Sequence, residues 1–215
     1  MGYPWGIAFG RYGVWAVADH TNHCVYLFDG EDQLVRKFGR NGTSDGEFRS
    51  PCGIAFDEDN HIYVVDSSNH RVQKFDIDGN RLLQIGSHGS GDGQLQSPYG
   101  ITTHNGRIYV GDNGNHRVSV FLYNGRISTK GTDRGQLYSP SGLVTDVNGF
   151  FLVGEVSSST DRVSVFDHAG VFINCFGSSG SASGQFNSPN GIAVGLNGSI
   201  YVSDYGNKRI QIFTN

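Results

Sequence analysis

The 215-residue chain lacks the features that mark several classes of protein. Five prolines are too few for a collagen-like or proline-rich disordered chain. The three cysteines are far apart and show no Cys-x-x-Cys spacing, which argues against a zinc finger or a disulfide framework. No run reaches the roughly 18 apolar residues of a membrane helix, and the first residues do not resemble a signal peptide. We therefore expect no membrane segment, no metal or other cofactor, and a cytoplasmic location.

An excess of charge of one sign is also missing. The 16 Lys and Arg residues nearly balance the 20 Asp and Glu residues, so the net charge of -4 gives no general attraction to DNA or to an anionic membrane. Glycine, in contrast, is abundant: 32 residues are about 15% of the chain, roughly twice the usual share. With 12% aromatic residues, this composition favours an ordered chain of strands separated by turns.

A repeat is visible at the prolines, because each of them begins a Pro-x-Gly tripeptide. The repeats begin at Pro4, Pro51, Pro98, Pro140 and Pro189, at intervals of 47, 47, 42 and 49 residues. Short apolar runs bounded by Gly, Asn and Asp follow each proline, four in each copy except the last, which has three. Such runs predict antiparallel strands joined by hairpin turns. A period of about 40 to 50 residues with four strands per unit is typical of a β-propeller.

Charged residues recur where the second run of each copy meets the third. The second run ends in an acid, and the third follows an Asn-His-Arg sequence, as in Asn69-His70-Arg71. Copy one has Cys24 in place of the arginine, and copy four lacks Asn-His. Because these groups recur, we assign them to the scaffold as ion pairs rather than to a metal site. The acids are Asp19, Asp66, Asp112, Glu155 and Asp204, and the arginines are Arg71, Arg117, Arg162 and Arg209.

This pattern resembles the NHL repeat, which takes its name from the Asn-His pair and a following aliphatic residue. The resemblance covers essentially the whole chain and is made five times in phase. It implies a recognition platform, as in the C-terminal domain of tripartite-motif (TRIM-NHL) proteins, where the propeller binds substrate or RNA for a ubiquitin ligase. Three scattered cysteines cannot supply the RING and B-box zinc modules of that family.

The predicted fold is all-β, with one β-propeller domain over residues 1–215. We expect five blades of four strands each, the last of them without its outer strand, because the sequence stops after the run at 209–213. Only three residues precede Pro4, too few to complete that blade, so an unpaired strand edge is expected there. Similar NHL propellers usually close with six blades. We therefore expect part of a six-bladed ring, with closure as five blades as the alternative.

Positions that differ between the copies are the candidates for binding. A ligand at the central face needs different groups on different blades, and the middle residue of Pro-x-Gly varies in this way. We expect these middle residues to face the central opening, with further residues contributed by the neighbouring loops. Aromatic and arginine side chains are common anchors for protein partners and for stacked single-stranded bases. The candidates are Trp5, Cys52, Tyr99 and Asn190 of the tripeptides, with Arg49, Arg134, Tyr138, Tyr205 and Lys208 of the loops.

Three functions are compatible with these residues. The first prediction is a non-catalytic module that binds a protein partner, in particular the substrate-recognition domain of a RING-type ubiquitin ligase. The second is a single-stranded RNA-binding propeller in post-transcriptional regulation, which ranks lower because the net charge is negative. The third is a metal-dependent lyase or a lactonase-like propeller. Such an enzyme needs an asymmetric metal cluster at the channel, whereas His23, His70 and His116 occupy equivalent positions on consecutive blades.

Overall fold

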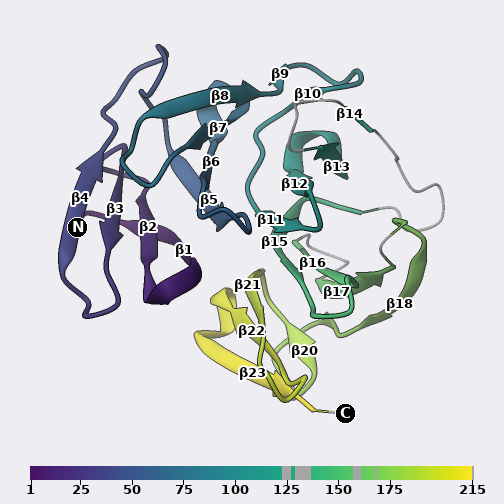
Figure 1. Ribbon diagram of the computed structural model, residues 1–215. Helices are drawn as coiled ribbons and strands as arrows, with labels where there is room; N and C mark the ends of the chain where they lie inside the picture. The colour runs from purple at the N-terminus through teal and green to yellow at the C-terminus, as the bar shows by residue number, and fades with distance from the viewer. Residues whose placement is uncertain (123–126, 129–136, 157–160, 168, 215) are drawn as a thin grey trace.

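Five antiparallel sheets follow one another around a central axis in the computed structural model, which describes residues 1–122, 127–128, 137–156, 161–167 and 169–214 (Figure 1). Blade 1 consists of β1 (Pro4–Phe9), β2 (Trp15–Asp19), β3 (Cys24–Phe28) and β4 (Leu34–Phe38). Blade 2 consists of β5 (Pro51–Phe56), β6 (Ile62–Asp66), β7 (Arg71–Phe75) and β8 (Arg81–Ile85). Blade 3 consists of β11 (Ile101–His104), β12 (Arg107–Asp112), β13 (Arg117–Leu122) and β14 (Ile127–Ser128). Blade 4 consists of β15 (Pro140–Thr145), β16 (Phe151–Glu155), β17 (Arg162–Phe166) and β18 (Phe172–Phe176).

Blade 5 has only three strands in the described part of the chain: β21 (Pro189–Val194), β22 (Ile200–Asp204) and β23 (Arg209–Phe213). The predicted five-bladed, all-β propeller with a three-stranded last blade is therefore confirmed. Two short parallel pairs lie in the connections, β9 (Ser87–His88) with β10 (Gln94–Leu95) and β19 (Ser178–Ser179) with β20 (Gln185–Phe186). The helices are single 3-10 turns: η1 (Arg11–Gly13), η2 (Ser67–Asn69), η3 (Asn113–Asn115) and η4 (Tyr205–Asn207). None in the described segments has the length and hydropathy needed to cross a membrane.

In blades 1 to 4, the glycine of Pro-x-Gly lets the innermost strands of neighbouring blades approach closely. A Cβ atom added to Gly53 would lie 2.2 Å from the carbonyl oxygen of Tyr99 in the next blade. Gly100 has the same relation to the carbonyl oxygen of Ser141, also at 2.2 Å. Any other residue would force these backbones apart, so the repeated glycine is a packing requirement of the propeller.

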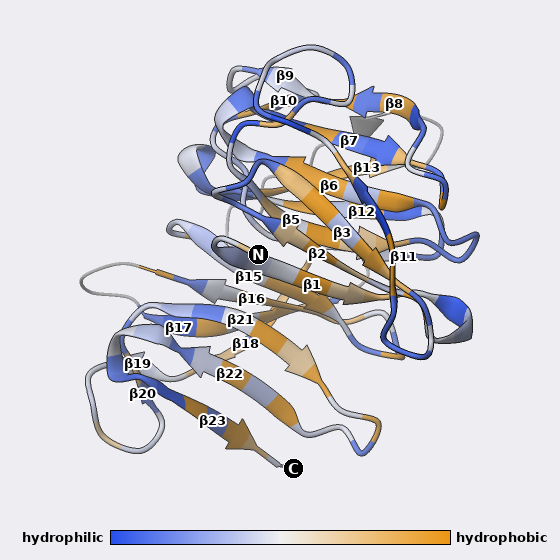
Figure 2. Ribbon diagram, turned by 90° about the vertical axis from the view of Figure 1, so that its left-hand side faces the viewer, coloured by the Kyte–Doolittle hydropathy of each residue, from blue (hydrophilic) through white to orange (hydrophobic). Residues whose placement is uncertain are grey.

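The hydrophobic core lies between the blades. Ala16 and Leu27 of blade 1 pack with Ile54, Ile62 and Phe75 of blade 2 in one buried cluster, and Figure 2 shows hydrophobic segments concentrated on the strands. Each long connection adds one large buried side chain to such a cluster. These side chains fill the space between blades, and they are Phe48, Leu95, Leu137 and Phe186.

The two outer faces of this row of blades are apolar and exposed. Ile7 and Phe9 on blade 1 are exposed, as are Ile210 and Ile212 on blade 5. Between these blades, faces of the same kind are covered by a neighbouring sheet. A six-bladed ring would cover both outer faces, and it stays a prediction.

Candidate binding face

Each repeated acid holds the loop that leads into its own blade. The backbone N–H two residues before the blade's proline donates to the acid, as from Arg49 to Asp66 Oδ1 over 2.6 Å. All five acids are completely buried. A constant buried group therefore positions the backbone of a residue that differs from blade to blade. The other donor and acceptor pairs are Gly2 with Asp19, Gln96 with Asp112, Tyr138 with Glu155, and Asn187 with Asp204, at 2.6 to 3.0 Å.

The predicted ion pairs form, and they lie within single blades. Arg71 Nε donates to Asp66 Oδ2 over 2.8 Å, and its Nη2 donates to the carbonyl oxygens of Ser44 and Glu47 over 2.9 Å. Each arginine thus joins the acid, and in blades 2, 3 and 5 also the long connection that precedes the blade. The other pairs are Arg117 with Asp112, Arg162 with Glu155, and Arg209 with Asp204, at 2.8 to 2.9 Å.

The repeated histidines connect one blade to the next. His70 Nδ1 accepts a hydrogen bond from the backbone N–H of Ser97 over 2.9 Å, and His23 and His116 make the same contact with Ser50 and Ser139. An unprotonated Nδ1 is required for this role. In blade 4 the carboxylate of Asp161 accepts the equivalent bond from Ser188. These histidines therefore have a role in the scaffold.

Asp19 differs from the other four acids because Cys24 occupies the position of its arginine. The carboxylate accepts hydrogen bonds from the N–H groups of Gly2, Tyr3 and Asn22 and from Asn22 Nδ2, at 2.6 to 3.1 Å. Burial raises the pKa of Asp19, but these hydrogen bonds outweigh it and lower the pKa to about 2. Among the described residues no Lys or Arg forms an ion pair with this carboxylate, and N–H groups are its hydrogen-bond donors.

Four aromatic side chains gather at the end of blade 1 where Asp19 lies. The Trp5 ring is 5.8 Å from Tyr3, 5.6 Å from His20 and 5.9 Å from Tyr99, between ring centroids. Trp5 is 38% exposed and Tyr3 is 45% exposed, while His20 Nδ1 is buried without a hydrogen-bond partner. We call Tyr3, Trp5, His20 and Tyr99 the aromatic cluster.

The aromatic cluster borders a small cavity of about 120 Å³ on the propeller axis. Trp5, Tyr99, Ser141 and Asn190 line it, so four of the five middle residues of Pro-x-Gly face the central opening as predicted. The innermost strands supply the rest of the wall, largely through glycine and aliphatic residues. Within the described residues, this wall contains no acid and no histidine.

Cys52, the fifth middle residue, was placed wrongly on the binding face. It is completely buried, and its Sγ donates to the carbonyl oxygen of Tyr99 over 3.3 Å. Burial raises the pKa of the thiol to about 12, so the thiol is neutral and inaccessible to a ligand. A small apolar side chain fits here because the neighbouring blade covers it.

The loop candidates surround the aromatic cluster at the same end of the blades. Arg49, Tyr138, Tyr205 and Lys208 are exposed, and Tyr138 stacks on His116 with 4.6 Å between ring centroids. Arg134 lies outside the described residues. We call this end of the propeller, with the aromatic cluster and these loops, the entry face.

One member of the aromatic cluster, Tyr3, was not predicted to be part of the binding face. Tyr3 directly precedes the first Pro-x-Gly, where the other copies have Ser50, Ser97, Ser139 or Ser188. That departure from the repeat was visible in the sequence and would have identified Tyr3. His20 follows the acid in a turn that varies between copies, and only the fold places it beside Trp5.

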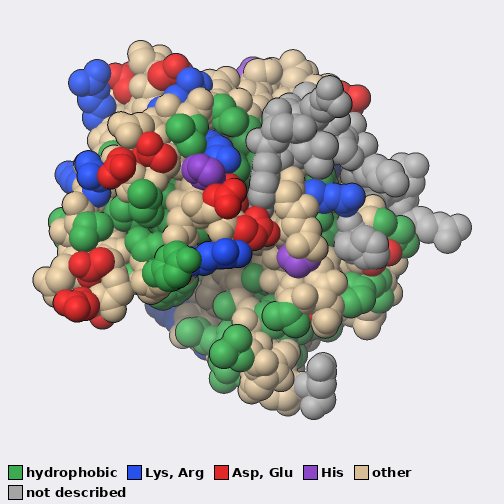
Figure 3. All heavy atoms as spheres, viewed as in Figure 1, with side chains coloured by type: hydrophobic (Ala, Val, Ile, Leu, Met, Phe, Trp, Pro, Cys, Tyr) green, Lys and Arg blue, Asp and Glu red, His purple; other side chains and the backbone are tan. Residues whose placement is uncertain are grey.

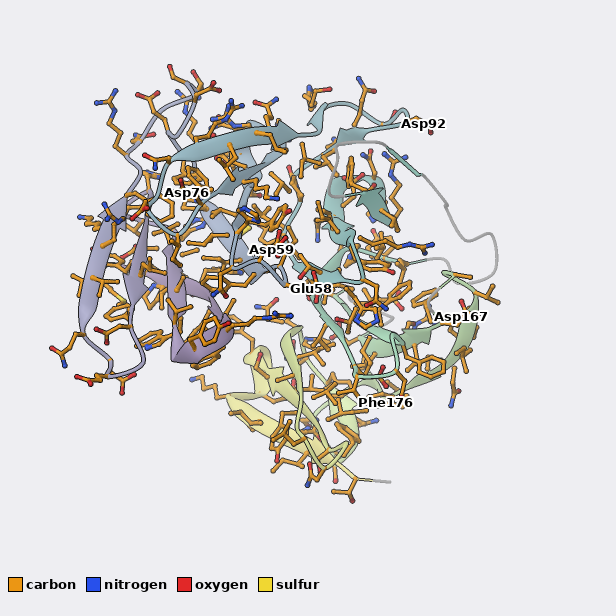
Figure 4. All side chains as sticks on the ribbon, in the orientation of Figure 1. Glu58, Asp59, Asp76, Asp92, Asp167 and Phe176 are labelled. Atoms are coloured by element: carbon orange, nitrogen blue, oxygen red, sulfur yellow. The ribbon has the colours of Figure 1, made fainter. Side chains whose placement is uncertain are left out.

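The opposite face carries the hairpin turns between first and second strands. In the view of Figure 3, acidic side chains lie near its centre, where Figure 4 labels Glu58 and Asp59. Close to them, the carboxylate of Asp57 accepts from Tyr63 and pairs with Lys74 and His61 at 3.0 to 3.3 Å. These contacts satisfy the carboxylate and explain why it is buried.

Comparisons with known proteins agree with this architecture. Residues 48–75, 95–121 and 186–213 match the model of the NHL repeat. The chain carries NHL repeats on a β-propeller. The matched segments belong to copies two, three and five, whereas copy one lacks the arginine and copy four lacks the Asn-His pair. No curated protein matches the chain.

Several solved structures share the fold at low sequence identity. A chain of a nidogen/laminin complex is 18% identical, with a TM-score of 0.74 over 97% of this chain and 74% of that one. A gluconolactonase from Xanthomonas campestris is 16% identical, with a TM-score of 0.73 over 98% and 75%. A streptogramin B lyase is 14% identical, with a TM-score of 0.63 over 99% and 83%. These neighbours include both binding proteins and enzymes. They therefore establish the fold, and the function has to be inferred from the residues of the site.

Proposed function

We propose that this chain is a non-catalytic recognition module that binds a protein partner through the entry face. The observation that carries the proposal is that recurring and varying residues occupy different places in the structure. Recurring residues such as Asp66 and Arg71 are buried and bound to each other, while the residues that vary between blades, such as Trp5 and Tyr138, are exposed at one end. A scaffold that holds different aromatic side chains at an exposed surface is suited to selecting one partner.

The composition of the channel favours binding over catalysis. Lactonase and lyase chemistry on a propeller needs ligands for a metal or a general base at the channel. The described channel wall offers aromatic, hydroxyl, amide and glycine groups instead. The nidogen/laminin neighbour is a propeller from a protein complex, which agrees with a binding role. A place in a tripartite-motif ubiquitin ligase and a cytoplasmic location remain part of the proposal, on the strength of the resemblance alone.

The test is a parallel selection on the purified 215-residue chain. A displayed library of random peptides and a pool of random single-stranded RNA are each enriched on the protein. We expect peptides to be enriched, and we expect Trp5→Ala with Tyr99→Ala to lower their binding by at least about tenfold, as for a central aromatic anchor.

The matched control removes two exposed aromatic side chains from the opposite face, with Tyr12→Ala and Phe150→Ala. This variant should bind the selected peptides like the wild type. Enrichment of RNA alone would assign the face to nucleic acid. Peptide binding that is lost in the control variant and kept in the Trp5 and Tyr99 variant would move the site to the opposite face.

A further inference from the structure

Blade 1 differs from the other blades in one electrostatic respect. In blades 2 to 5 the buried acid forms an ion pair with an arginine, so each site is close to neutral. In blade 1 the register that pairs Asp66 with Arg71 pairs Asp19 with Cys24. Because its pKa is near 2, Asp19 is charged at neutral pH. Asp19 is therefore a buried anion that forms no ion pair in the described part of the chain.

The anion is hydrogen-bonded to the backbone of the aromatic cluster. The backbone N–H of Tyr3 donates to Asp19 Oδ1 over 3.1 Å, and His20 follows Asp19 in the chain. Tyr3 and Trp5 are adjacent to this contact, and their exposed rings open toward solvent. The faces of aromatic rings carry partial negative charge and attract cations. The ring faces and the Asp19 carboxylate thus both attract a positively charged ligand.

We propose that the aromatic cluster receives a cationic side chain of the partner, lysine or arginine, and that Asp19 supplies the charge that selects it. This inference rests on the proposed function and names the chemistry of the partner residue. The cation would lie against Trp5, Tyr3 and Tyr99, with its charge above the Asp19 site. A phosphate group at the same place would meet the same negative charge and be repelled.

The two tryptophans of the chain make a direct experiment possible. Trp5 belongs to the aromatic cluster, whereas Trp15 donates from Nε1 to Asp32 and stacks on Phe28. Their indole N–H signals in an NMR spectrum of the ¹⁵N-labelled protein report the site and an internal control, and Trp15→Phe assigns them. The probes are N-acetyl-arginine amide and its neutral isostere N-acetyl-citrulline amide, with uridine monophosphate as the test for base stacking.

We expect the arginine probe to shift the Trp5 signal saturably and to leave the Trp15 signal in place. The citrulline probe should bind roughly fivefold more weakly, the scale of an exposed cation–π contact. Asp19→Asn should weaken arginine binding by about three- to tenfold through loss of the charge. The matched control is Asp204→Asn, which changes an equivalent acid on blade 5 and should leave the arginine affinity unchanged.

Cys24→Arg is a second variant that leaves Asp19 in place. It gives blade 1 the ion pair of the other blades and should abolish the preference for arginine over citrulline. A thermal melt of each variant identifies those that do not fold. Should Asp19→Asn fail to fold, the wild-type preference for arginine over citrulline and the Cys24→Arg variant still decide the matter.

Equal affinity for arginine and citrulline would overturn the inference, and so would tighter binding of uridine monophosphate. Failure of the inference is separable from failure of the proposed function. If the selected peptides bind through Trp5 and Tyr99 but need no basic residue, the proposed binding module stands and the proposed cationic contact is rejected. Arginine binding at Trp5 without any peptide enrichment would keep the contact and reject the protein-binding module.

Discussion

Blades 2 and 5 have closely similar sequences but very different surroundings. Arg71 and Arg209 make the same ion pair at 2.8 Å, yet the first side chain is 7% exposed and the second 30%. Directly before the last aromatic residue of the third strand, Lys74 is buried at 8% exposure and Ile212 is exposed at 59%. Blade 2 is covered by neighbours on both sides, whereas one side of blade 5 is open.

Lys74 and Ile212 occupy equivalent positions in blades 2 and 5, yet the lysine is buried and the isoleucine is exposed. The place of a blade in the row therefore determines which of its side chains are buried. Lys74 can be buried because its Nζ forms an ion pair with Asp57 at 3.3 Å and lies 5.1 Å from the centroid of the Tyr63 ring. Ile212 would be expected in a core, and its exposure marks a face without a neighbour. The sequence of a single repeat therefore does not determine which of its side chains are buried. Equivalent substitutions in the two blades measure what the neighbour contributes.

The largest difference is expected at the acids. Asp66→Ala should lower the free energy of unfolding by about 3 to 5 kcal/mol, because the buried Arg71 would lose its counter-charge. Asp204→Ala should cost about 1 to 2 kcal/mol less, since Arg209 can reach water. Urea unfolding followed by circular dichroism gives both values. Equal losses would show that the covering blade does not matter.

The glycines should show the next largest difference. Gly53→Ala places a Cβ 2.2 Å from the carbonyl oxygen of Tyr99 and should cost about 1 to 3 kcal/mol or more. Gly191→Ala meets only the Ser203 hydroxyl at 3.0 Å and should cost less than about 1 kcal/mol. The same unfolding experiment applies. A tolerated Gly53→Ala would contradict the close approach of the innermost strands.

A smaller effect is expected at the contact between blades 2 and 3. Burial, with help from the nearby His88, lowers the pKa of His70 below 6.5. Its contribution to stability should therefore be complete above pH 6.5 and be lost as the pH falls through the folded-state pKa. His70→Ala should cost about 1 kcal/mol at pH 8 and flatten the decline in stability at lower pH. A variant with the wild-type pH profile would exclude this histidine as the cause.

The smallest effect is expected on the open face of blade 5. Ile210→Ser should change the free energy of unfolding by no more than about 0.5 kcal/mol, because the side chain is already 68% exposed. Val72→Ala, at the equivalent buried position of blade 2, should cost about 1 to 3 kcal/mol. A large loss for Ile210→Ser would indicate that this face is covered in solution, and sedimentation of the wild type would then reveal an assembly.

The sequence was sufficient for the fold because the repeat appears in it five times. The Pro-x-Gly positions, the pairing of Asp66 with Arg71 and the three-stranded last blade all follow from the pattern of runs and turns. The site was harder to predict, because it depends on contacts between blades. Cys52 and Tyr99 occupy the same position in the repeat, yet the next blade covers one and leaves the other at the channel.

The most direct test of the central claim compares binding and stability in one protein. The Trp5→Ala and Tyr99→Ala double variant is titrated with the peptide selected on the wild type, and its urea midpoint is measured in parallel. We predict a loss of affinity of at least about tenfold with the cooperative unfolding transition retained. Unchanged affinity in the folded double variant would contradict the account, because the variable aromatic residues of the entry face would then play no part in recognition.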